Sequence, residues 1–295
     1  MKVAILGCGP TGLMAAHACH QLKVDATVFS KKRKSELFGS QYLHKPVAVN
    51  PYSGVNVKYV VLGTPEEYRQ KVHGKWWDGH VAPEDFEPDH KAWNIRTAYD
   101  NLWTIYGRDV VGYTIPDPSM FSDTYRDDGA MFETVSRDLG LHKFDLVIST
   151  VPRDLWRISG EEFIYSEGWA LGDAPERGIF VEDLLASSFG EVPLYQKPDG
   201  SYIPDNHIIC DGTGQVPWTR LSRVFGYTTV EWPHHAPQPH PLAARVRKPL
   251  HYTPSKSTRN PTADWLHVGR YGQFEKGIVV TDAYDDVIKR IKEMK

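Results

Sequence analysis

Three glycines near the start of the chain have the spacing of a phosphate-binding turn. Residues 7–12 read Gly-Cys-Gly-Pro-Thr-Gly, which is the pattern GxGxxG. In such a turn the first glycine permits a tight bend, the second lets the backbone approach a pyrophosphate, and the third lets a helix pack closely on a strand. The N–H groups at the start of that helix then face the phosphates. The motif predicts dinucleotide contacts from five residues: Gly7, Gly9, Pro10, Thr11 and Gly12.

The segments on either side of the motif support this prediction. Residues 2–6 are apolar and predict a buried strand, residues 13–19 are rich in helix-forming residues, and residues 25–29 predict a second strand. A glycine turn alone is weak evidence and can exist without a ligand. The order strand, turn, helix, strand therefore favours a dinucleotide-binding unit.

The second predicted strand ends without the acidic residue that usually binds the adenosine ribose. Ser30 stands eighteen residues after Gly12, and the basic run Lys31-Lys32-Arg33-Lys34 follows it. We expect Ser30 and Lys31 to lie beside the adenosine end of the ligand. A basic cluster here would suit the 2′-phosphate of NADP, although a solvated loop has the same composition.

Catalytic candidates come from polar side chains after this unit. The mixed loop of residues 37–44 should return towards the nucleotide, and the imidazole of His44 can take up a proton near neutral pH. A structural role for this histidine is the competing interpretation. We expect three catalytic candidates: His44, Tyr42 and Arg220.

Aromatic side chains, 12% of the chain, are candidates for a substrate pocket. Residues 91–106 predict an amphipathic helix with an aromatic face, on which Arg96 would meet an anionic or planar ligand. An arginine stacked on its neighbours at the surface is an equally good interpretation. The predicted substrate contacts are Arg96, Tyr99, Trp103 and Trp218.

Composition excludes several classes of protein. The chain has 295 residues, a net charge of −3 and three cysteines, so neither a disulfide framework nor binding to DNA through overall basicity is expected. No apolar run approaches the length of a membrane span, and we expect a cytoplasmic protein. The histidines of residues 234–251 lie among prolines without carboxylate or cysteine partners, so no metal site is expected.

Two later segments complete a family resemblance. Residues 144–152 predict a central strand that ends in Thr150, Val151 and Pro152, and residues 265–272 predict a strand followed by Gly269, Arg270 and Tyr271. Together with the amino-terminal GxGxxG they resemble the glutathione-reductase-type flavoproteins, in particular the amine-oxidase and UDP-galactopyranose-mutase branch. The run Pro217-Trp218-Thr219-Arg220 is similar to a Pro-Tyr-Thr-Arg segment of the mutases.

The resemblance implies an α/β fold with FAD as cofactor. A Rossmann-like FAD-binding domain would be discontinuous in sequence, comprising residues 1–50, 141–155 and 263–295. An inserted α+β substrate or cap domain would comprise residues 51–140 and 156–262. In that family the glycine turn holds the FAD pyrophosphate and the last Gly-Arg pair lies at the flavin end, which adds Thr150, Val151, Pro152, Gly269, Arg270 and Tyr271 to the predicted cofactor contacts.

The leading hypothesis is an FAD-dependent oxidoreductase that oxidises a C–N or C–O bond of a small or medium substrate. One alternative is a non-redox flavoenzyme, a mutase or lyase, acting on a nucleotide, a nucleotide sugar or a modified nucleobase in DNA. Its phosphates would be clamped by Arg96, Arg220 and Arg223. The other alternative is an NADP-dependent reductase or nucleotide-binding module that uses the basic run.

Overall fold

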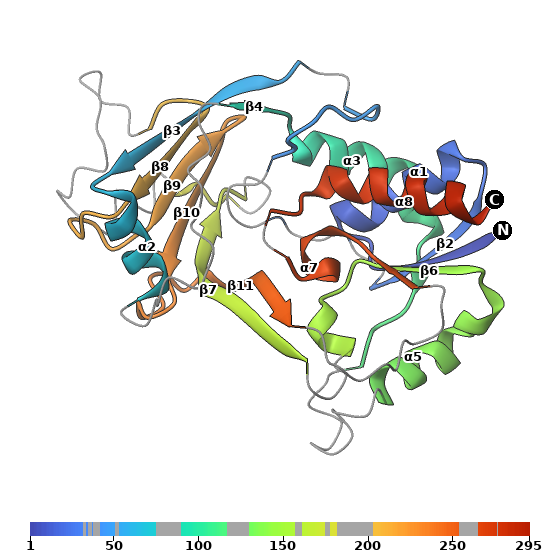
Figure 1. The fold of residues 1–295 in the computed structure, drawn as a ribbon. Helices are drawn as coiled ribbons and strands as arrows, with labels where there is room; N and C mark the ends of the chain where they lie inside the picture. Colours follow the sequence, from blue (N-terminus) through green and yellow to red (C-terminus); the bar gives the residue numbers. More distant parts are fainter. Residues whose placement is uncertain are drawn as a thin grey trace.

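Two β-sheets organise the chain. The computed structural model describes residues 1–31, 34, 37, 42–50, 53–74, 90–116, 130–156, 161–174, 178–181, 203–253, 265–275 and 277–295. Its strands form one sheet of five strands and one of seven, joined through long connections (Figure 1). Within the described residues, no helix is both long and apolar enough to cross a bilayer.

The five-stranded sheet is parallel throughout. It comprises β1 (Lys2–Leu6), β2 (Asp25–Ser30), β5 (Val111–Gly112), β6 (Leu146–Ser149) and β12 (Trp265–His267), in the spatial order β12-β6-β1-β2-β5. Numbered along the chain, this order is 5-4-1-2-3, the arrangement of a dinucleotide-binding sheet. The direction of the strand order reverses between β1 and β6, where such sheets bind their ligands.

Helices cover both faces of this sheet. Val3 and Ile5 of β1 share a core with α1 (Pro10–Gln21), α3 (Ile95–Tyr106) and α8 (Val280–Met294). Ala4 and Leu6 point the other way and pack with α5 (Ala130–Leu139). Because successive strand residues face opposite sides, the continuous apolar run of residues 3–6 is what a strand covered on both faces requires. The result is a three-layer α/β unit (Figure 1).

The second sheet is mainly antiparallel. Its strands are β3 (Val55–Leu62), β4 (His90–Ala92), β7 (Glu162–Gly172), β8 (His207–Asp211), β9 (Arg220–Val224), β10 (Tyr227–Pro233) and β11 (Ala244–Thr253), in the order β11-β7-β10-β9-β8-β3-β4. Only β3 and β8 pair in parallel. Helix α2 (Pro65–His73) packs on one face, which we call the α2 face. Thr64 and Glu67 form the capping box that starts this helix, and Pro65 lies in its first turn.

Three elements from residues 51–140 belong with the five-stranded sheet rather than the second one. Strand β5 pairs with β2, α3 packs on α1, and α5 shares a core with β1 and β6. The expected domain boundary at residue 51 therefore does not describe this packing, although the division into two domains stays a prediction. The strands expected within residues 2–6, 25–29, 144–152 and 265–268 are present.

The two sheets are joined by a short helix. The carboxyl ends of the parallel strands point towards the seven-stranded sheet, whereas both chain termini lie on the opposite side (Figure 1). Helix α7 (Gly269–Gln273) follows β12 at this junction. Arg270 donates from Nε and Nη2 to the carbonyl oxygen of Pro249 at 3.0 Å each, and the Tyr271 hydroxyl donates to the carbonyl of Arg247 at 3.1 Å. These acceptors lie on β11, one of the two edge strands of the second sheet.

A buried ion pair fixes α2 against the second sheet. The ammonium of Lys71 lies 2.6 Å from Asp211, whose side chain is 3% exposed, and also donates to the carbonyl of Val216 at 2.7 Å. Thr213 donates a further hydrogen bond to Asp211 at 3.0 Å. Removing one member of such a pair leaves the other charge buried without compensation.

We predict that Lys71→Met lowers the free energy of unfolding by about 3 to 5 kcal/mol, because Asp211 would stay buried and charged. Urea denaturation measures the effect. The matched control is Lys45→Met, which removes an exposed lysine lying 3.6 Å from Asp282 and from Asp285 and should cost under about 1 kcal/mol. Equal losses in the two variants would contradict the argument.

Candidate functional site

The glycine turn lies at the reversal point of the parallel sheet. Gly7 has a φ of +105°, which favours glycine, and its N–H donates to the carbonyl of Phe29 at 2.9 Å. A Cβ at Gly7 would lie 2.4 Å from Oγ1 of Thr150, and a Cβ at Gly12 would lie 2.0 Å from the carbonyl oxygen of Gly7. Side chains at these two positions are sterically excluded, as the motif predicts.

The helix that starts at this turn presents its N–H groups without competition from side chains. Gly9 is the N-cap of α1, Pro10 lies in the first turn, and no side chain caps the helix. The first turn also contains no acidic residue. The positive end of the helix dipole is therefore available to an anion, and a diphosphate would satisfy N–H groups that have no partner within the helix.

Residues far apart in sequence complete the walls of this turn. Thr150 follows β6 and donates both its N–H and its hydroxyl to the carbonyl of Leu6, at 3.0 and 2.9 Å. Gly269, at a φ of +71°, packs so closely on α1 that a Cβ there would lie 2.5 Å from Cγ2 of Thr11. The structure thus brings together Gly7, Thr11, Gly12, Thr150 and Gly269, with Val151 and Pro152 directly after Thr150.

The expected adenosine end lies where β2 leaves the sheet. The carbonyl of Ser30 accepts the N–H of Tyr113 at 2.8 Å, and the carbonyl of Lys31 lies 3.7 Å from the thiol of Cys8. Lys34 forms an ion pair with Asp100 and lies 5.4 Å from the centre of the Tyr99 ring. Lys32 and Arg33 lie outside the described residues. The charge of Lys34 is therefore offset, which weakens the case for a basic 2′-phosphate site.

Two predicted substrate residues instead support the glycine turn. Tyr99 is 1% exposed, and its hydroxyl donates to the carbonyl of Cys8 at 2.8 Å. Trp103 packs edge-on against the Tyr99 ring in the core beneath the sheet. The Tyr99 ring is enclosed by that core, whereas Trp103 is partly buried at its border. The contacts of Tyr99 suit holding the turn in place. Direct contact with a substrate stays a prediction for them.

Arg96 connects the two layers. Its guanidinium lies 4.2 Å from the centre of the Tyr227 ring, at the start of β10. Burial lowers the pKa of Arg96, while Tyr227 and Asp173 act in the opposite direction. The structure thus agrees with an arginine stacked on an aromatic neighbour, although the neighbour belongs to the other sheet.

Tyr42 and His44 join an aromatic cluster on β3 and β4. The hydroxyl of Tyr42 lies 2.9 Å from that of Tyr59, and its ring lies 4.9 Å from His44 and 5.0 Å from His90. The His44 and His90 rings are nearly parallel, with centres 5.8 Å apart. Tyr42 and His44 are therefore neighbours, whereas Arg220 lies elsewhere on the sheet. Their catalytic roles stay predictions.

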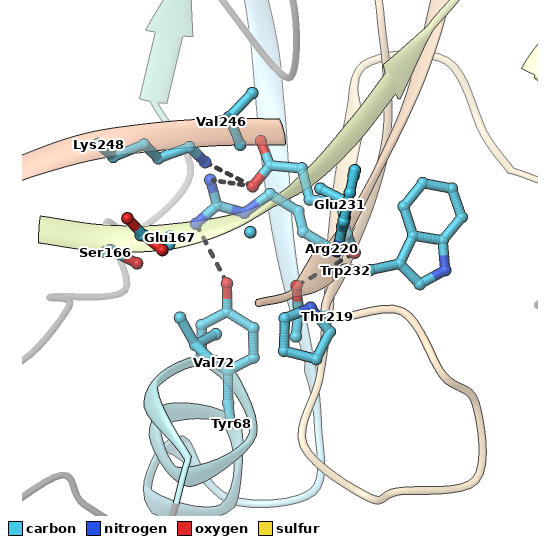
Figure 2. Close-up of a pocket in the computed structure, with 13 residues that line it drawn as sticks. Tyr68, Val72, Ser166, Glu167, Thr219, Arg220, Glu231, Trp232, Val246 and Lys248 are labelled. Carbon is cyan, nitrogen blue, oxygen red and sulfur yellow. Dashed lines mark hydrogen bonds and ion pairs between the residues drawn. The ribbon is translucent and has the colours of Figure 1, made fainter. Parts of the chain in front are cut away.

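Arg220 lines a pocket on the α2 face of the second sheet. Its Nη2 lies 3.2 Å from the hydroxyl of Tyr68, and its Nη1 lies 3.9 Å from Glu231. The ammonium of Lys248 donates to the same carboxylate at 2.5 Å. Figure 2 shows Arg220 and Lys248 both directed at Glu231, while Tyr68 approaches from α2. The cavity volume of the pocket is about 30 Å³, which is room for roughly two water molecules.

Trp218 and Arg223 do not reach this pocket. Arg220 pairs in register with Glu231, so both side chains lie on the α2 face. Trp218 is 2% exposed and packs with Leu221 in the core on the opposite face. Arg223 is three residues from Arg220 on the same strand, so its side chain points to the opposite face of the sheet. It pairs there with Asp205 at 2.6 Å. Arg96 lies over the ring of Tyr227, away from both. The three arginines therefore do not form the predicted clamp.

Arg220 is the one residue of the pocket lining that the sequence predicted. Among the lining residues that were missed are its polar neighbours Tyr68, Glu231 and Lys248. They come from α2, β10 and β11, so no local spacing connects them. The alternation of β10 and β11 would have placed Glu231 and Lys248 on a face once the pairing with β7 was known. That pairing is the missing signal.

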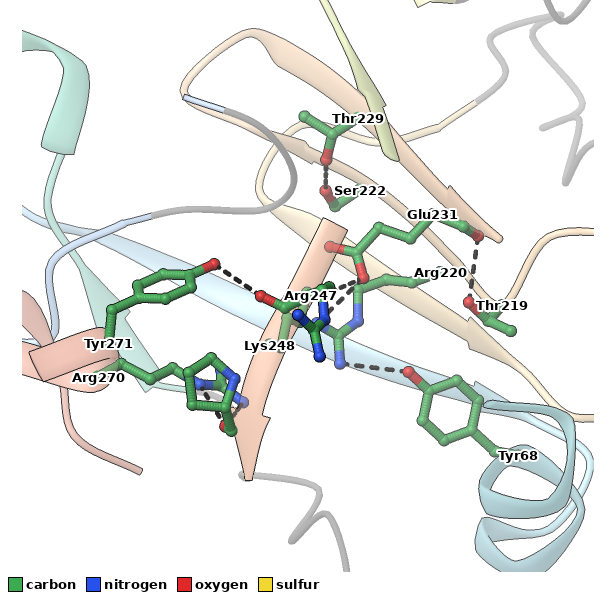
Figure 3. Close-up of polar contacts among 11 residues, drawn as sticks. Tyr68, Thr219, Arg220, Ser222, Thr229, Glu231, Arg247, Lys248, Arg270 and Tyr271 are labelled. Atoms are coloured by element: carbon green, nitrogen blue, oxygen red, sulfur yellow. Dashed lines mark hydrogen bonds and ion pairs between the residues drawn. The ribbon is translucent and has the colours of Figure 1, made fainter. Parts of the chain in front are cut away.

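Arg270 and Tyr271 lie between the glycine turn and the pocket. Figure 3 shows both side chains directed at the backbone of β11, next to the group formed by Lys248, Glu231 and Arg220. Burial and the negative charge of Glu231 raise the pKa of Tyr271, and Arg270 acts against this shift. Their observed contacts join the layers, and contact with a cofactor stays a prediction.

Comparisons with known proteins find only remote likenesses. No family model matches, and no curated protein matches. Among solved structures, the chain resembles Tar14, a tryptophan C-6 flavin-dependent halogenase from taromycin biosynthesis, with 11% identity, 100% of this chain and 72% of that chain covered, and a TM-score of 0.48. CtdE in complex with FAD and a substrate (12% identity, 98% and 79% covered, TM-score 0.44) and HpxO from Klebsiella pneumoniae complexed with FAD (12%, 98% and 79%, TM-score 0.43) are similar matches. Likenesses this remote assign neither a cofactor nor an activity to this chain.

A mostly buried histidine ends β12 at the carboxyl edge of the parallel sheet. His267 pairs in register with Ser149. Burial lowers its pKa to about 4, and the positive charge of Arg153 contributes to the shift. The imidazole is therefore neutral in the folded protein near pH 6, whereas in the unfolded chain it takes up a proton below its ordinary value of 6.5.

We predict that this histidine lowers stability in acid. Between about pH 6.5 and pH 4 the unfolded state binds the extra proton, so the free energy of unfolding should fall with decreasing pH by up to about 3 kcal/mol. Above pH 6.5 the contribution is complete and constant. His267→Gln should flatten this part of the stability profile in urea denaturation at a series of pH values, whereas His142→Gln, at an exposed position, should not. An unchanged slope in His267→Gln would disprove the assignment.

Proposed function

We propose that the chain is an FAD-dependent oxidoreductase that oxidises a C–N or C–O bond of a small or medium substrate. The observation that carries the proposal is the glycine turn at the reversal point of a parallel sheet ordered 5-4-1-2-3. Ligands of such sheets bind outside the carboxyl ends of the strands. In this chain those ends face a second sheet that carries a polar pocket.

The residues at the turn fit the diphosphate of FAD. Gly7 and Gly12 keep the space above the turn free of side chains, and the uncapped start of α1 supplies N–H donors to an anion. Ser30 and Lys31 would meet the adenosine ribose through backbone groups or the Ser30 hydroxyl, because no acidic residue stands there. The predicted contacts of Thr150, Val151, Pro152, Gly269, Arg270 and Tyr271 would extend the site towards the second sheet.

The second sheet would hold the substrate. When bound, FAD supplies an acceptor for a hydride or two electrons. Arg220, Lys248 and the Tyr68 hydroxyl offer donors that orient a polar substrate group. His44, the predicted proton acceptor, lies with Tyr42 and His90 at the β3 and β4 end of the sheet and is therefore not part of this pocket. This arrangement supports the oxidoreductase over the nucleotide-clamping alternative. That alternative needs three arginines to converge on one ligand, and in this chain they lie apart.

We predict that the purified protein binds FAD and that Gly7→Ala abolishes this binding. The added methyl would lie 2.4 Å from Oγ1 of Thr150, and the alanine would have to adopt the φ of +105° that the turn requires. Titration of the apoprotein with FAD, followed by flavin fluorescence and by the absorption band near ~450 nm that flavin chemistry brings, measures the effect.

The matched control is Gly226→Ala. This glycine also has a positive φ, +74°, but a Cβ there would meet nothing within 4 Å. It therefore imposes a similar backbone strain without closing the turn, and it should bind FAD as the unaltered protein does. A colourless protein that takes up no FAD would overturn the proposed function.

A further inference from the structure

We propose that Asp154 is a positioning residue of the glycine turn: it ties the loop after β6 to the second sheet and thereby holds Thr150 against Gly7. The inference rests on the proposed function in so far as the turn binds the diphosphate of FAD. The tie itself is a property of the FAD-free chain, so it can also be tested without the cofactor. Its basis is a set of contacts that runs from the glycine turn to β7 and β11.

Residues 149–156 form a loop that is closed on itself, which we call the β6 loop. The N–H of Leu155 donates to the carbonyl of Pro152 at 3.0 Å, and the indole N–H of Trp156 donates to the hydroxyl of Ser149 at 3.1 Å. Trp156 is 6% exposed and packs in the same core as α5. Because these bonds join the two ends of the β6 loop, a displacement of one end should also displace the other.

The first end of the β6 loop contacts the glycine turn. Thr150 donates its N–H and its hydroxyl to the carbonyl of Leu6, the residue before the turn. Its Oγ1 occupies the space next to Gly7 that a Cβ would need. A shift of Thr150 would therefore change the shape of the turn that faces the ligand, and a ligand site binds less tightly when its groups are less well preorganised.

The second half of the β6 loop is bonded to the second sheet through Asp154. The hydroxyl of Tyr165, on β7, donates to Oδ2 of Asp154, and Nη1 of Arg247, on β11, lies 4.0 Å from the same oxygen. The Arg247 guanidinium also lies 3.6 Å from the centre of the Tyr165 ring. Oδ1 of Asp154 is buried and has no hydrogen-bond partner within the described residues. A carboxylate in such surroundings needs the donor and the positive charge that β7 and β11 supply.

The other wall of the glycine turn is attached to the same place on the second sheet. Gly269 packs on the turn, and Tyr271, two residues later, donates its hydroxyl to the carbonyl of Arg247 at 3.1 Å (Figure 3). Phe274, which follows α7, packs edge-on against the ring of Tyr165 with the ring centres 4.7 Å apart. Both segments that close on the turn therefore meet at Arg247 and Tyr165, so the β7 and β11 pair is placed to fix the shape of the turn.

The first test measures nucleotide binding to Asp154→Ala. Isothermal titration calorimetry of the full-length apoprotein uses FAD as one probe and ADP, which has a diphosphate but no flavin, as the other. We expect both dissociation constants to rise about tenfold, because Thr150 is no longer held against the turn. The matched control is Asp138→Ala. Asp138 lies on α5 and has the same kinds of partner, the hydroxyl of Tyr113 at 3.4 Å and Arg137 at 3.5 Å, so its loss should leave both constants unchanged.

A double-mutant cycle tests whether Asp154 acts through Tyr165. Tyr165→Phe removes the donating hydroxyl but keeps the ring that packs on Phe274, and it should weaken nucleotide binding about three- to tenfold. Because both changes break the same tie, the double variant should bind no more weakly than Asp154→Ala alone. Fully additive losses would overturn the proposal. So would variants whose free energy of unfolding in urea falls while their dissociation constants stay the same, since Asp154 would then be merely structural.

Hydrogen exchange of the nucleotide-free chain separates failure of this proposal from failure of the proposed function. Followed by mass spectrometry, exchange in peptides covering residues 7–14 and 148–156 should be faster in Asp154→Ala than in Asp138→Ala. A chain that takes up neither FAD nor ADP but shows this difference loses the oxidoreductase assignment and retains the tie. A chain that binds FAD and shows no such difference retains the assignment and overturns the tie. Circular dichroism spectra confirm that each variant is folded before its data are interpreted.

Discussion

The contact between the glycine turn and the end of β6 is the constraint on which the rest of the structure depends. Thr150 binds the Leu6 carbonyl through two hydrogen bonds, and its hydroxyl occupies the space that a side chain at Gly7 would need. This contact joins β1 to β6 at the point where the strand order reverses. It also directs α1 so that its amino terminus opens at the carboxyl edge of the sheet, and that orientation is what makes the edge suitable for an anionic ligand.

The second sheet supplies what the first one lacks. The parallel unit offers backbone donors at its glycine turn. The antiparallel sheet alternates apolar residues towards one core with Arg220, Glu231 and Lys248 towards α2. A sheet buried on both faces can recognise a ligand through backbone at its edge. The α2 face of the second sheet instead carries charged side chains beside an apolar cluster that includes Val57, Ile208 and Val224.

The sequence predicted the amino-terminal part of the parallel sheet well because its signals are local. The GxGxxG turn, the strand before it and the helix after it lie within twenty residues of one another, and each is formed as expected. The place of α3 was missed, since its amphipathic pattern specifies an apolar face but not which sheet that face covers. Strand β5 has only two residues, Val111 and Gly112, too few to show alternation. Likewise, Tyr68, Glu231 and Lys248 meet only through strand pairing over long sequence distances.

The hydrogen bonds from α7 to β11 have a consequence for the behaviour of the protein in solution. Strand β11 is an edge of its sheet, and unpaired carbonyls on an exposed edge can recruit a strand from another molecule. Arg270 and Tyr271 occupy the carbonyls of Pro249 and Arg247, alternate positions along that edge. The same two side chains that hold the layers together thereby protect the sheet from aggregation, so a chain in which the layers separate would also become prone to self-association.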